Sequence, residues 1–330
     1  MNVLVTGGAG YIGSHTVLSL IARNHKVAVL DDLSTGFSWA VPKSAQLYVG
    51  DVADGALVER IIRDHKIDAV IHFAGSVIVP ESVSDPLKYY FNNTVKSRSL
   101  IEQCVGCGVS HFIFSSTAAV YGILDAEQVT ETAPLNPVSP YGRSKLMTEW
   151  MLEDVAAASG LTYAALRYFN VAGADPEGRS GQSTRLATHL IKVGVEAAIG
   201  QRPHVDIFGE DYPTPDGTGI RDYIHVSDLA AAHVAALEHL ASGGASFVAN
   251  CGYGKGASVR EVLDAIDRVG DVTLVRRSAP RRAGDPARLV ADPAKIHALL
   301  DWTPQFTDLD QIVAHALAWE RALPGIRGKS

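Results

Sequence analysis

The feature that most constrains this chain is a glycine-rich turn between two short apolar segments near its start. Residues 3–6 are apolar, as in a buried strand, and the motif GGAGYIG follows at residues 7–13. Residues 14–23 then carry apolar side chains at helical spacing, and residues 26–30 predict a second strand that ends at Asp31. A strand, a glycine turn, a helix, a strand and an acid in this order predict a dinucleotide site.

Each part of this segment has a physical role. Gly7 and Gly10 allow a tight turn whose N–H groups can approach a pyrophosphate, and a helix N-terminus favours that anion. Gly13 allows the helix to pack close to the strand. Asp31 can accept both hydroxyls of an adenosine ribose and would repel a 2′-phosphate, so we expect NAD rather than NADP. The alternative is a surface turn without a ligand, and the flanking strands, helix and acid favour the cofactor site.

Composition restricts the class of protein. The chain has 330 residues, enough for one large domain or two modest ones, and 47% of them are hydrophobic. A net charge of −7 without a basic block argues against a nucleic-acid partner, and no apolar run approaches membrane-spanning length. The first residues predict a strand rather than a signal peptide, and three cysteines cannot form a disulfide framework. We therefore expect a cytoplasmic protein, and we interpret Cys104 and Cys107 as reduced thiols rather than metal ligands.

The order of elements predicts the fold class. Further strands are expected at residues 46–49, 68–73, 111–114 and 163–168, alternating with helices at 56–64, 86–104 and 141–158. This alternation is typical of an α/β fold with a doubly wound parallel sheet. It breaks after Asn170, where we expect a helix at 186–199 and a strand at 205–208, and it returns with a helix at 226–240 and a strand at 247–251. We therefore expect a Rossmann domain of residues 1–170 plus about 222–251, and a smaller substrate lobe of about 171–221 plus 252–330.

Several polar or small residues follow the expected strands. Asp51 can accept from an adenine amino group, or else Asp51 or Asp54 starts the next helix as its N-cap, and the two aspartates can divide these roles. Ala74 and the glycine after it leave room for a ligand beside the backbone. A Ser-Ser-Thr run ends at Thr117. The carboxyl ends of these strands are therefore the expected place of the site.

The pattern Y-x-x-x-K at Tyr141 and Lys145 begins an expected helix. Its spacing places both side chains on one helical face, where the ammonium group would lower the pKa of the tyrosine. A tyrosine of this kind can act as a base near neutral pH. The alternative is a surface tyrosine stacked over a lysine stem, and the preceding glycine motif and Ser/Thr-rich strand end favour catalysis.

With these motifs the chain resembles the extended short-chain dehydrogenase/reductase superfamily. The later motifs LRYFN (166–170), GTGIRDYIHV (217–226) and APRRAGD (279–285) resemble the UDP-glucose 4-epimerase family and extend the likeness over nearly the whole chain. The resemblance implies an isomerase in which Tyr141 takes the proton of the sugar 4-hydroxyl while a hydride passes to NAD. The 4-keto sugar then turns and is reduced on its other face. It also implies that Thr117 bridges by a hydrogen bond and that Lys145 assists.

The resemblance also implies two sets of binding residues. The NAD site would comprise Gly7, Gly10, Tyr11, Ile12, Gly13, Asp31, Asp51, Val52, Phe73, Ala74, Asn92, Thr117, Tyr141, Lys145 and Phe169. The UDP-sugar would be held by Thr117, Tyr141, Asn170, His189, Leu190, Phe208, Arg221, Arg282, Asp285 and Leu289. Arginines suit a diphosphate and an aromatic ring suits uracil. Alternatively, Arg221 pairs with Asp222 and Phe208 belongs to the core.

Three positions depart from the pattern of some family members. Val77 replaces a lysine, His189 replaces an asparagine, and Leu289 replaces a tyrosine near the sugar. Because leucine leaves more room, we expect slow turnover of an N-acetylated sugar, with UDP-glucose the better substrate. A UDP-N-acetylglucosamine or UDP-pentose 4-epimerase therefore remains an alternative.

Two other functions fit the sequence less well. A nucleotide-sugar dehydratase needs an acidic pair after the threonine, where this chain has Ala118 and Ala119. A non-catalytic NAD-binding regulator would commonly lack the tyrosine or the lysine. The resemblance further implies a homodimer that pairs the helices at Pro86–Cys104 and Tyr141–Ala158 in a four-helix bundle.

Overall fold

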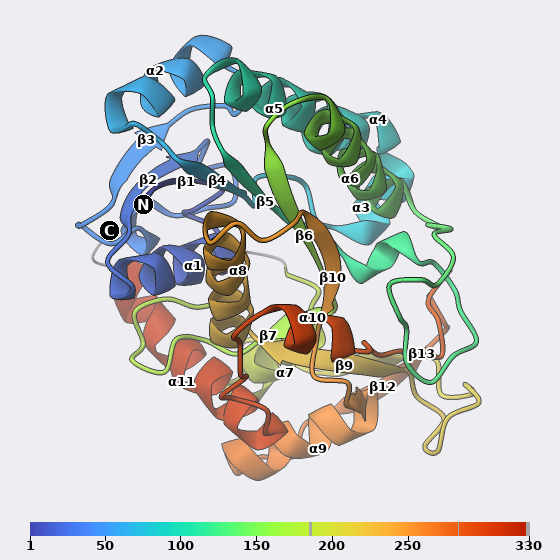
Figure 1. The fold of residues 1–330 in the computed structure, drawn as a ribbon. Coiled ribbons are helices and arrows are strands. Elements are labelled where there is room, and N and C mark those ends of the chain that lie inside the picture. The colour runs from blue at the N-terminus through green and yellow to red at the C-terminus, as the bar shows by residue number, and fades with distance from the viewer. Residues whose placement is uncertain (185–186, 283, 328–330) are drawn as a thin grey trace.

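A parallel sheet of seven strands forms the centre of the molecule (Figure 1). The computed structural model describes residues 1–184, 187–282 and 284–327. The strand order is β10-β6-β5-β4-β1-β2-β3, and each adjacent pair is parallel, as a doubly wound fold requires. The strands are β1 (Asn2–Thr6), β2 (Lys26–Asp31), β3 (Gln46–Val49), β4 (Ala69–His72), β5 (His111–Ser115), β6 (Thr162–Tyr168) and β10 (Phe247–Cys251).

Helices cover both faces of this sheet (Figure 1). One face packs against α1 (Tyr11–Ala22) and α8 (Val226–Ala241), and the other against α2 (Gly55–His65), α5 (Lys96–Gly106) and α6 (Pro140–Ala158). Strand β1 shows why: Val3 and Val5 point into the first cluster, whereas Leu4 points into the second. The continuous apolar runs in the sequence are therefore strands buried on both faces.

The segment expected to be one helix over residues 86–104 is interrupted. It comprises α4 (Pro86–Tyr89), a π-helical stretch (Tyr90–Val95) and α5, preceded by α3 (Val79–Ser84). The side chain of buried Asn93 in the π-helical stretch accepts from the Ser76 N–H and donates to the Ser76 carbonyl. Such stretches often lie at functional sites. Here the stretch orients Asn92, which donates to the Ser76 hydroxyl at 3.0 Å.

A second group of elements lies beyond one end of the sheet, at the bottom of Figure 1. Its core is formed by apolar side chains of α7, α9 and α11. Its strands are β7 (Asn170–Ala172), β8 (Val205–Phe208), β9 (Ile220–His225), β11 (Gly256–Ser258), β12 (Arg276–Ala279) and β13 (Arg288–Leu289). Its helices are α7 (Leu190–Ala198), α9 (Val259–Gly270) and α11 (Leu309–Arg327), whereas α10 (Ala294–Leu299) packs against β10 of the central sheet. Two 3-10 turns lie elsewhere, at Ser38–Ala40 and Ala118–Val120.

The differences from the sequence prediction concentrate in this second group. Helix α7 begins at Leu190, and the expected start at 186 lies outside the described residues. Strand β9 was not predicted, although it is the strand to which β7, β11 and β13 all pair. Among the described residues, each helix is too short or too polar to cross a lipid bilayer.

Candidate active site

The glycine turn is shaped by close backbone contacts. Gly7 has φ +71°, and a Cβ atom there would lie 2.6 Å from the Ala74 nitrogen, at the end of the neighbouring strand β4. A Cβ atom on Gly13 would lie 2.2 Å from the Gly7 carbonyl oxygen. Gly10 is the N-cap of α1 and offers no side-chain acceptor, and the first helical turn contains no acidic residue. The first N–H groups of α1 are thus left for a ligand, which fits the pyrophosphate of a dinucleotide.

Asp31 lies at the end of β2 beside this turn. Its two carboxylate oxygens accept the N–H groups of Ala9 and Leu33, each at 2.9 Å. Burial raises the pKa of Asp31, and these backbone hydrogen bonds limit the rise. A carboxylate oxygen has lone pairs beyond the one used in each bond, so Asp31 can still accept from ribose hydroxyls.

The two aspartates after β3 have different partners. Asp54 is the N-cap of α2 and accepts from Leu57 N–H at 3.1 Å. Asp51 accepts from Ala53 N–H at 2.9 Å and pairs with Lys96 at 2.6 Å. Burial opposes ionisation of Asp51, but the Lys96 hydrogen bond and charge lower its pKa overall. The capping role thus belongs to Asp54, and the Lys96 contact was not predicted.

The remaining residues predicted to bind the cofactor follow the carboxyl ends of the sheet strands. Val52 is buried after β3, Phe73 and Ala74 follow β4, and Phe169 follows β6. Tyr11 and Ile12 begin α1, and the Tyr11 hydroxyl donates to the Gly173 carbonyl at 2.7 Å. Val77 is 51% exposed. The carboxyl edge of a parallel sheet is where doubly wound folds bind nucleotides, so these positions fit NAD.

The predicted catalytic residues are all buried at the same edge. Tyr141 and Lys145 lie in the first turns of α6, and Thr117 follows β5. The Lys145 ammonium donates to the Ser115 carbonyl at 2.9 Å. Burial raises the pKa of Tyr141, and a hydrogen bond with Thr117 acts in the opposite direction. The expected net lowering of the Tyr141 pKa by Lys145 is therefore wrong, because desolvation dominates here.

The arginine region brings together several of the predicted substrate residues. Arg221 on β9 donates to Asp285 at 2.5 Å and to the Pro286 carbonyl at 2.7 Å. The guanidinium group of Arg282 lies 3.9 Å from the centroid of the Phe208 ring. The backbone N–H of Asp285 donates to the Arg282 carbonyl at 3.2 Å, so the two pairs lie close together. Two cations and an aromatic ring in one place suit a nucleoside diphosphate.

The alternative pairing of Arg221 with its neighbour Asp222 is wrong. Strand residues alternate in direction, and Asp222 is fully buried, where it accepts from the N–H groups of Tyr253 and Gly254. Burial raises the pKa of Asp222 to about 6. Asp222 thus anchors a turn, whereas Arg221 stays on the side of Asp285.

Three other predicted residues line one hollow. Its volume is about 460 Å³, which includes space that is open to solvent. The three residues are Asn170, His189 and Leu190, and Tyr11 from the glycine turn lines the same hollow. Burial lowers the pKa of His189, which keeps its imidazole neutral and able to hydrogen-bond. Leu289 is only partly buried and packs against the cluster that contains Phe169. The hollow therefore connects the two predicted sets of residues.

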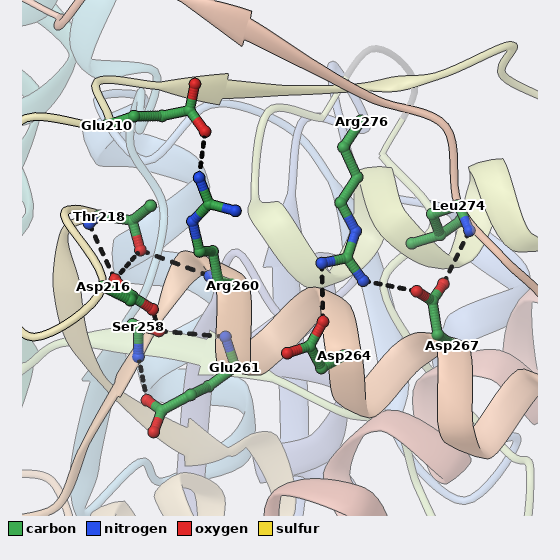
Figure 2. Close-up of polar contacts among 10 residues, drawn as sticks. All are labelled: Glu210, Asp216, Thr218, Ser258, Arg260, Glu261, Asp264, Asp267, Leu274 and Arg276. Atoms are coloured by element: carbon green, nitrogen blue, oxygen red, sulfur yellow. Dashed lines mark hydrogen bonds and ion pairs between the residues drawn. The ribbon is translucent and has the colours of Figure 1, made fainter.

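Helix α9 holds the loop that precedes Arg221 (Figure 2). Ser258 caps α9 in a capping box and its hydroxyl donates to Asp216 in that loop at 2.5 Å. Arg260 in the first turn pairs with Glu210 in the same loop. These contacts leave the loop little freedom, which defines where Arg221 emerges on β9.

The same helix holds the strand that leads to Arg282. Arg276 on β12 donates to Asp264 at 2.7 Å and to Asp267 at 2.5 Å, two carboxylates one helical turn apart (Figure 2). The N–H of Leu274 also donates to Asp267. A single helix thus supports both arginine-bearing segments, although no sequence motif marks it as part of the site.

Sequence reasoning missed two further features. The segment 173–184 crosses the start of α1, where the Ser14 and Ser180 hydroxyls share a hydrogen bond of 2.6 Å. Glu149 on α6 lies four residues after Lys145 and pairs with Arg167 on β6. The spacing of Tyr141, Lys145 and Glu149 by four residues could have placed Glu149 on the catalytic face of α6, but it does not indicate the pairing with Arg167.

Comparison with known proteins agrees with this geometry. Residues 3–252 match the model of the NAD dependent epimerase/dehydratase family. The chain is 55% identical to a UDP-glucose 4-epimerase of Azospirillum brasilense, over 97% of this chain and 92% of that protein. It is similar in structure to a Brucella ovis UDP-glucose 4-epimerase solved with NAD (TM-score 0.93, 45% identity, 96% and 97% of the two chains covered). It is also similar to the UDP-Glc/GlcNAc 4-epimerase of Campylobacter jejuni (TM-score 0.85, 47% identity, 97% and 99% covered).

Proposed function

This chain belongs to the NAD dependent epimerase/dehydratase family, and on that premise we propose that it interconverts UDP-glucose and UDP-galactose by inverting C4 of the hexose. The observation that carries this proposal is the buried cluster of Tyr141, Thr117 and Lys145 at the edge of the sheet that also forms the glycine turn. An acid–base group, a hydrogen-bond partner and a fixed cation at the mouth of a dinucleotide site suit reversible oxidation of a secondary alcohol.

In this mechanism the Tyr141 phenolic oxygen takes the proton of the sugar 4-hydroxyl and later returns it. When bound, NAD supplies reversible hydride chemistry and, in its oxidised form, a positive charge. Thr117 hydrogen-bonds Tyr141 and so favours the phenolate. Lys145 is held by the Ser115 carbonyl at 2.9 Å, which leaves its other two N–H groups for the cofactor or for Tyr141.

The chain's own residues would hold the cofactor and the nucleotide part of the substrate. The first N–H groups of α1 and Asp31 would hold the pyrophosphate and the adenosine ribose of NAD. Arg221 and Arg282 would neutralise the UDP diphosphate, and Phe208 offers a face for the uracil ring. Because these groups bind only the nucleotide, the hexose is free to turn between the two half-reactions.

The direct test measures UDP-galactose formed from UDP-glucose by the purified protein, with UDP-N-acetylglucosamine and UDP-xylose in parallel reactions. Tyr141→Phe should lower turnover by roughly a hundredfold or more, because the general base is lost, while bound NAD measured after denaturation stays unchanged. Tyr163→Phe is the matched control, since Tyr163 is also buried but lies at the start of β6, away from the carboxyl edge of the sheet. Near-normal turnover in Tyr141→Phe would overturn the mechanism.

A homodimer is part of the same proposal. Val83, Leu87, Phe91 and Val95 follow one another at intervals of four residues along α3, α4 and the π-helical stretch, and they are 65%, 77%, 54% and 48% exposed. Trp150 on the adjacent α6 is 51% exposed. A row of this kind on two neighbouring helices suits burial against the same two helices of a second copy, which makes a four-helix bundle.

Sedimentation velocity tests the dimer. Leu87→Glu should yield monomers, because it places a charge in the middle of the row. Val275→Glu should remain dimeric, since Val275 is 57% exposed but lies in the other group of elements, before β12. A Leu87→Glu protein that sediments as the wild type does would exclude this interface.

We further propose that residues 1–170 with about 222–251 act as the NAD-binding domain, and about 171–221 with 252–330 as the UDP-sugar lobe. The apolar cluster of α7, α9 and α11 is separate from the two clusters that cover the sheet, which supports this division, whereas Ile296, Leu300 and Trp302 pack with the sheet. All three cysteines are free thiols, which suits a reducing cytoplasm, where the reaction would serve galactose metabolism.

A further inference from the structure

Three charged side chains lie buried behind the proposed catalytic tyrosine. Lys145, Glu149 and Arg167 are 3%, 4% and 4% exposed. Lys145 and Glu149 are one turn apart on α6, the spacing at which lysine and glutamate commonly pair. Glu149 instead pairs with Arg167, which comes from β6.

The Arg167 contact occupies both oxygens of the Glu149 carboxylate. Arg167 Nε donates to Oε1 at 3.0 Å and Nη2 donates to Oε2 at 2.5 Å, and the Ser116 hydroxyl also donates to Oε1. On its other side Arg167 donates to the Tyr121 hydroxyl at 3.0 Å, and that hydroxyl donates to Asn250 at 2.7 Å. The guanidinium group is therefore held from two directions. Lys145 donates instead to the Ser115 carbonyl.

We propose that Arg167 is a positioning residue for the catalytic pair: by holding Glu149, it keeps this carboxylate from pairing with Lys145 and leaves the ammonium group available to Tyr141. The proposal rests on the proposed function of Tyr141 as the base. The three buried charges sum to one positive charge, which stabilises the phenolate form of Tyr141. Without Arg167 the sum is zero and the carboxylate is free to draw Lys145 away.

The other titratable groups around this cluster keep one charge state near physiological pH. His72 on β4 has its pKa lowered to about 3 by burial and by the charge of Lys145. Tyr168, Tyr121 and Tyr89 have raised pKa values because of burial. Glu81 is occupied by Lys88 and the Tyr89 hydroxyl. A pH-dependent change in this region thus reflects Tyr141 or Lys145.

The test compares two single variants with their combination. Arg167→Met should move the acidic limb of the pH dependence of kcat upward by about one pH unit, because the phenolate loses its net positive surroundings. Glu149→Gln should move the same limb downward, since two cations then face Tyr141. The double variant Arg167→Met/Glu149→Gln restores one net positive charge, so its limb should return to the wild-type position. Two single shifts in the same direction, or a double variant that stays displaced, would refute the proposal.

Loss of a buried charge can prevent folding, so a conservative variant accompanies this set. Arg167→Lys keeps the charge but cannot hold both carboxylate oxygens in a planar fork, and its limb should move upward by less than that of Arg167→Met. An unmoved limb in Arg167→Lys contradicts the positioning role. Asp228→Asn is the control for loss of a buried carboxylate elsewhere, and its limb should not move.

A second measurement does not depend on turnover. The near-ultraviolet absorbance of tyrosinate, taken as the difference between each protein and its Tyr141→Phe counterpart, titrates Tyr141 directly. The same order of pKa values is expected: Arg167→Met above wild type, and Glu149→Gln below it. If the wild-type protein does not interconvert UDP-hexoses, the proposed function fails, and this titration still decides whether Arg167 controls Tyr141.

Discussion

Replacing Gly13 by alanine tests how closely the glycine turn and helix α1 must approach. The added Cβ atom would lie 2.2 Å from the Gly7 carbonyl oxygen, 2.8 Å from the Gly8 Cα atom and 2.9 Å from the Gly7 carbonyl carbon. A relaxed carbon–oxygen contact is about 3.3 Å. Because all three neighbours are backbone atoms, no side chain can rotate away, and the start of α1 must retreat by roughly 1 Å.

The cost follows from this displacement. Overpacking of a tight site costs roughly 1–3 kcal/mol, and contact with backbone favours the upper end. Alanine has a better helix propensity than glycine, which offsets about 1 kcal/mol of this cost. We therefore expect a net loss of about 2 kcal/mol in the free energy of unfolding. For a chain of this length that corresponds to roughly 3 °C in Tm. The N–H groups at the start of α1 move as well, and NAD affinity should fall by about tenfold or more.

The assay measures NAD retained after gel filtration and the unfolding temperature with and without added NAD. Gly106→Ala is the matched control, because it is also a helical glycine but a Cβ atom there meets nothing within 4 Å. We expect the control to retain its NAD and to be as stable as the wild type or slightly more so. Equal NAD content and equal unfolding temperatures in Gly13→Ala and Gly106→Ala would show that the close approach is not needed.

Three other measurements follow from the structure. Mass spectrometry of cofactor released on denaturation should find NAD, because the buried Asp31 carboxylate would repel a 2′-phosphate by roughly 3 kcal/mol; mainly NADP would contradict this. Leu289→Tyr should lower turnover of UDP-N-acetylglucosamine more than that of UDP-glucose, and an unchanged ratio would remove Leu289 from the sugar pocket. The free energy of unfolding measured in urea should fall between about pH 7.5 and about pH 5.5. Unfolded histidines bind protons below about pH 6.5 whereas buried ones do not, so each buried histidine lowers this free energy by about 1.4 kcal/mol per pH unit. Asp222, with its raised pKa, opposes this change in part, and a flat profile would refute the sign. The histidines that burial holds at pKa values of about 3 to 4 are His15, His72, His225 and His233.

The sequence predicts the central sheet because most of its strands are continuous apolar runs that are buried on both faces. Such a run is recognisable without knowledge of its neighbours, and the boundaries of β2 and β3 agree with the prediction to within a residue. The glycine turn and the Tyr141–Lys145 pair are also local, since each is encoded within a few consecutive residues. Local patterns of this kind carry their geometry with them.

The substrate group could not be predicted to the same extent because its strands depend on distant partners. Strand β13 has only two residues, Arg288 and Leu289, and it exists because they pair with Ile220 and Arg221 on β9. No periodicity can reveal a strand so short. Arg221 and Asp285 are 64 positions apart in the sequence. The sequence alone therefore could not distinguish Asp285 from the adjacent Asp222 as the partner of Arg221. The structure does, because neighbouring residues of β9 point to opposite faces of the strand.

The protonation state of the catalytic residues likewise could not be predicted from the sequence alone. Tyr141 and Lys145 are four residues apart, and from that spacing alone a lowered tyrosine pKa follows. Burial reverses the result, and burial is a property of the whole fold rather than of the helix. The groups that act against it come from other elements: Thr117 after β5 supplies a hydrogen bond, and Arg167 on β6 occupies the carboxylate that would otherwise neutralise Lys145. A motif on one helix therefore identifies which atoms react, whereas the protonation state in which they meet the substrate is decided by two neighbouring strands.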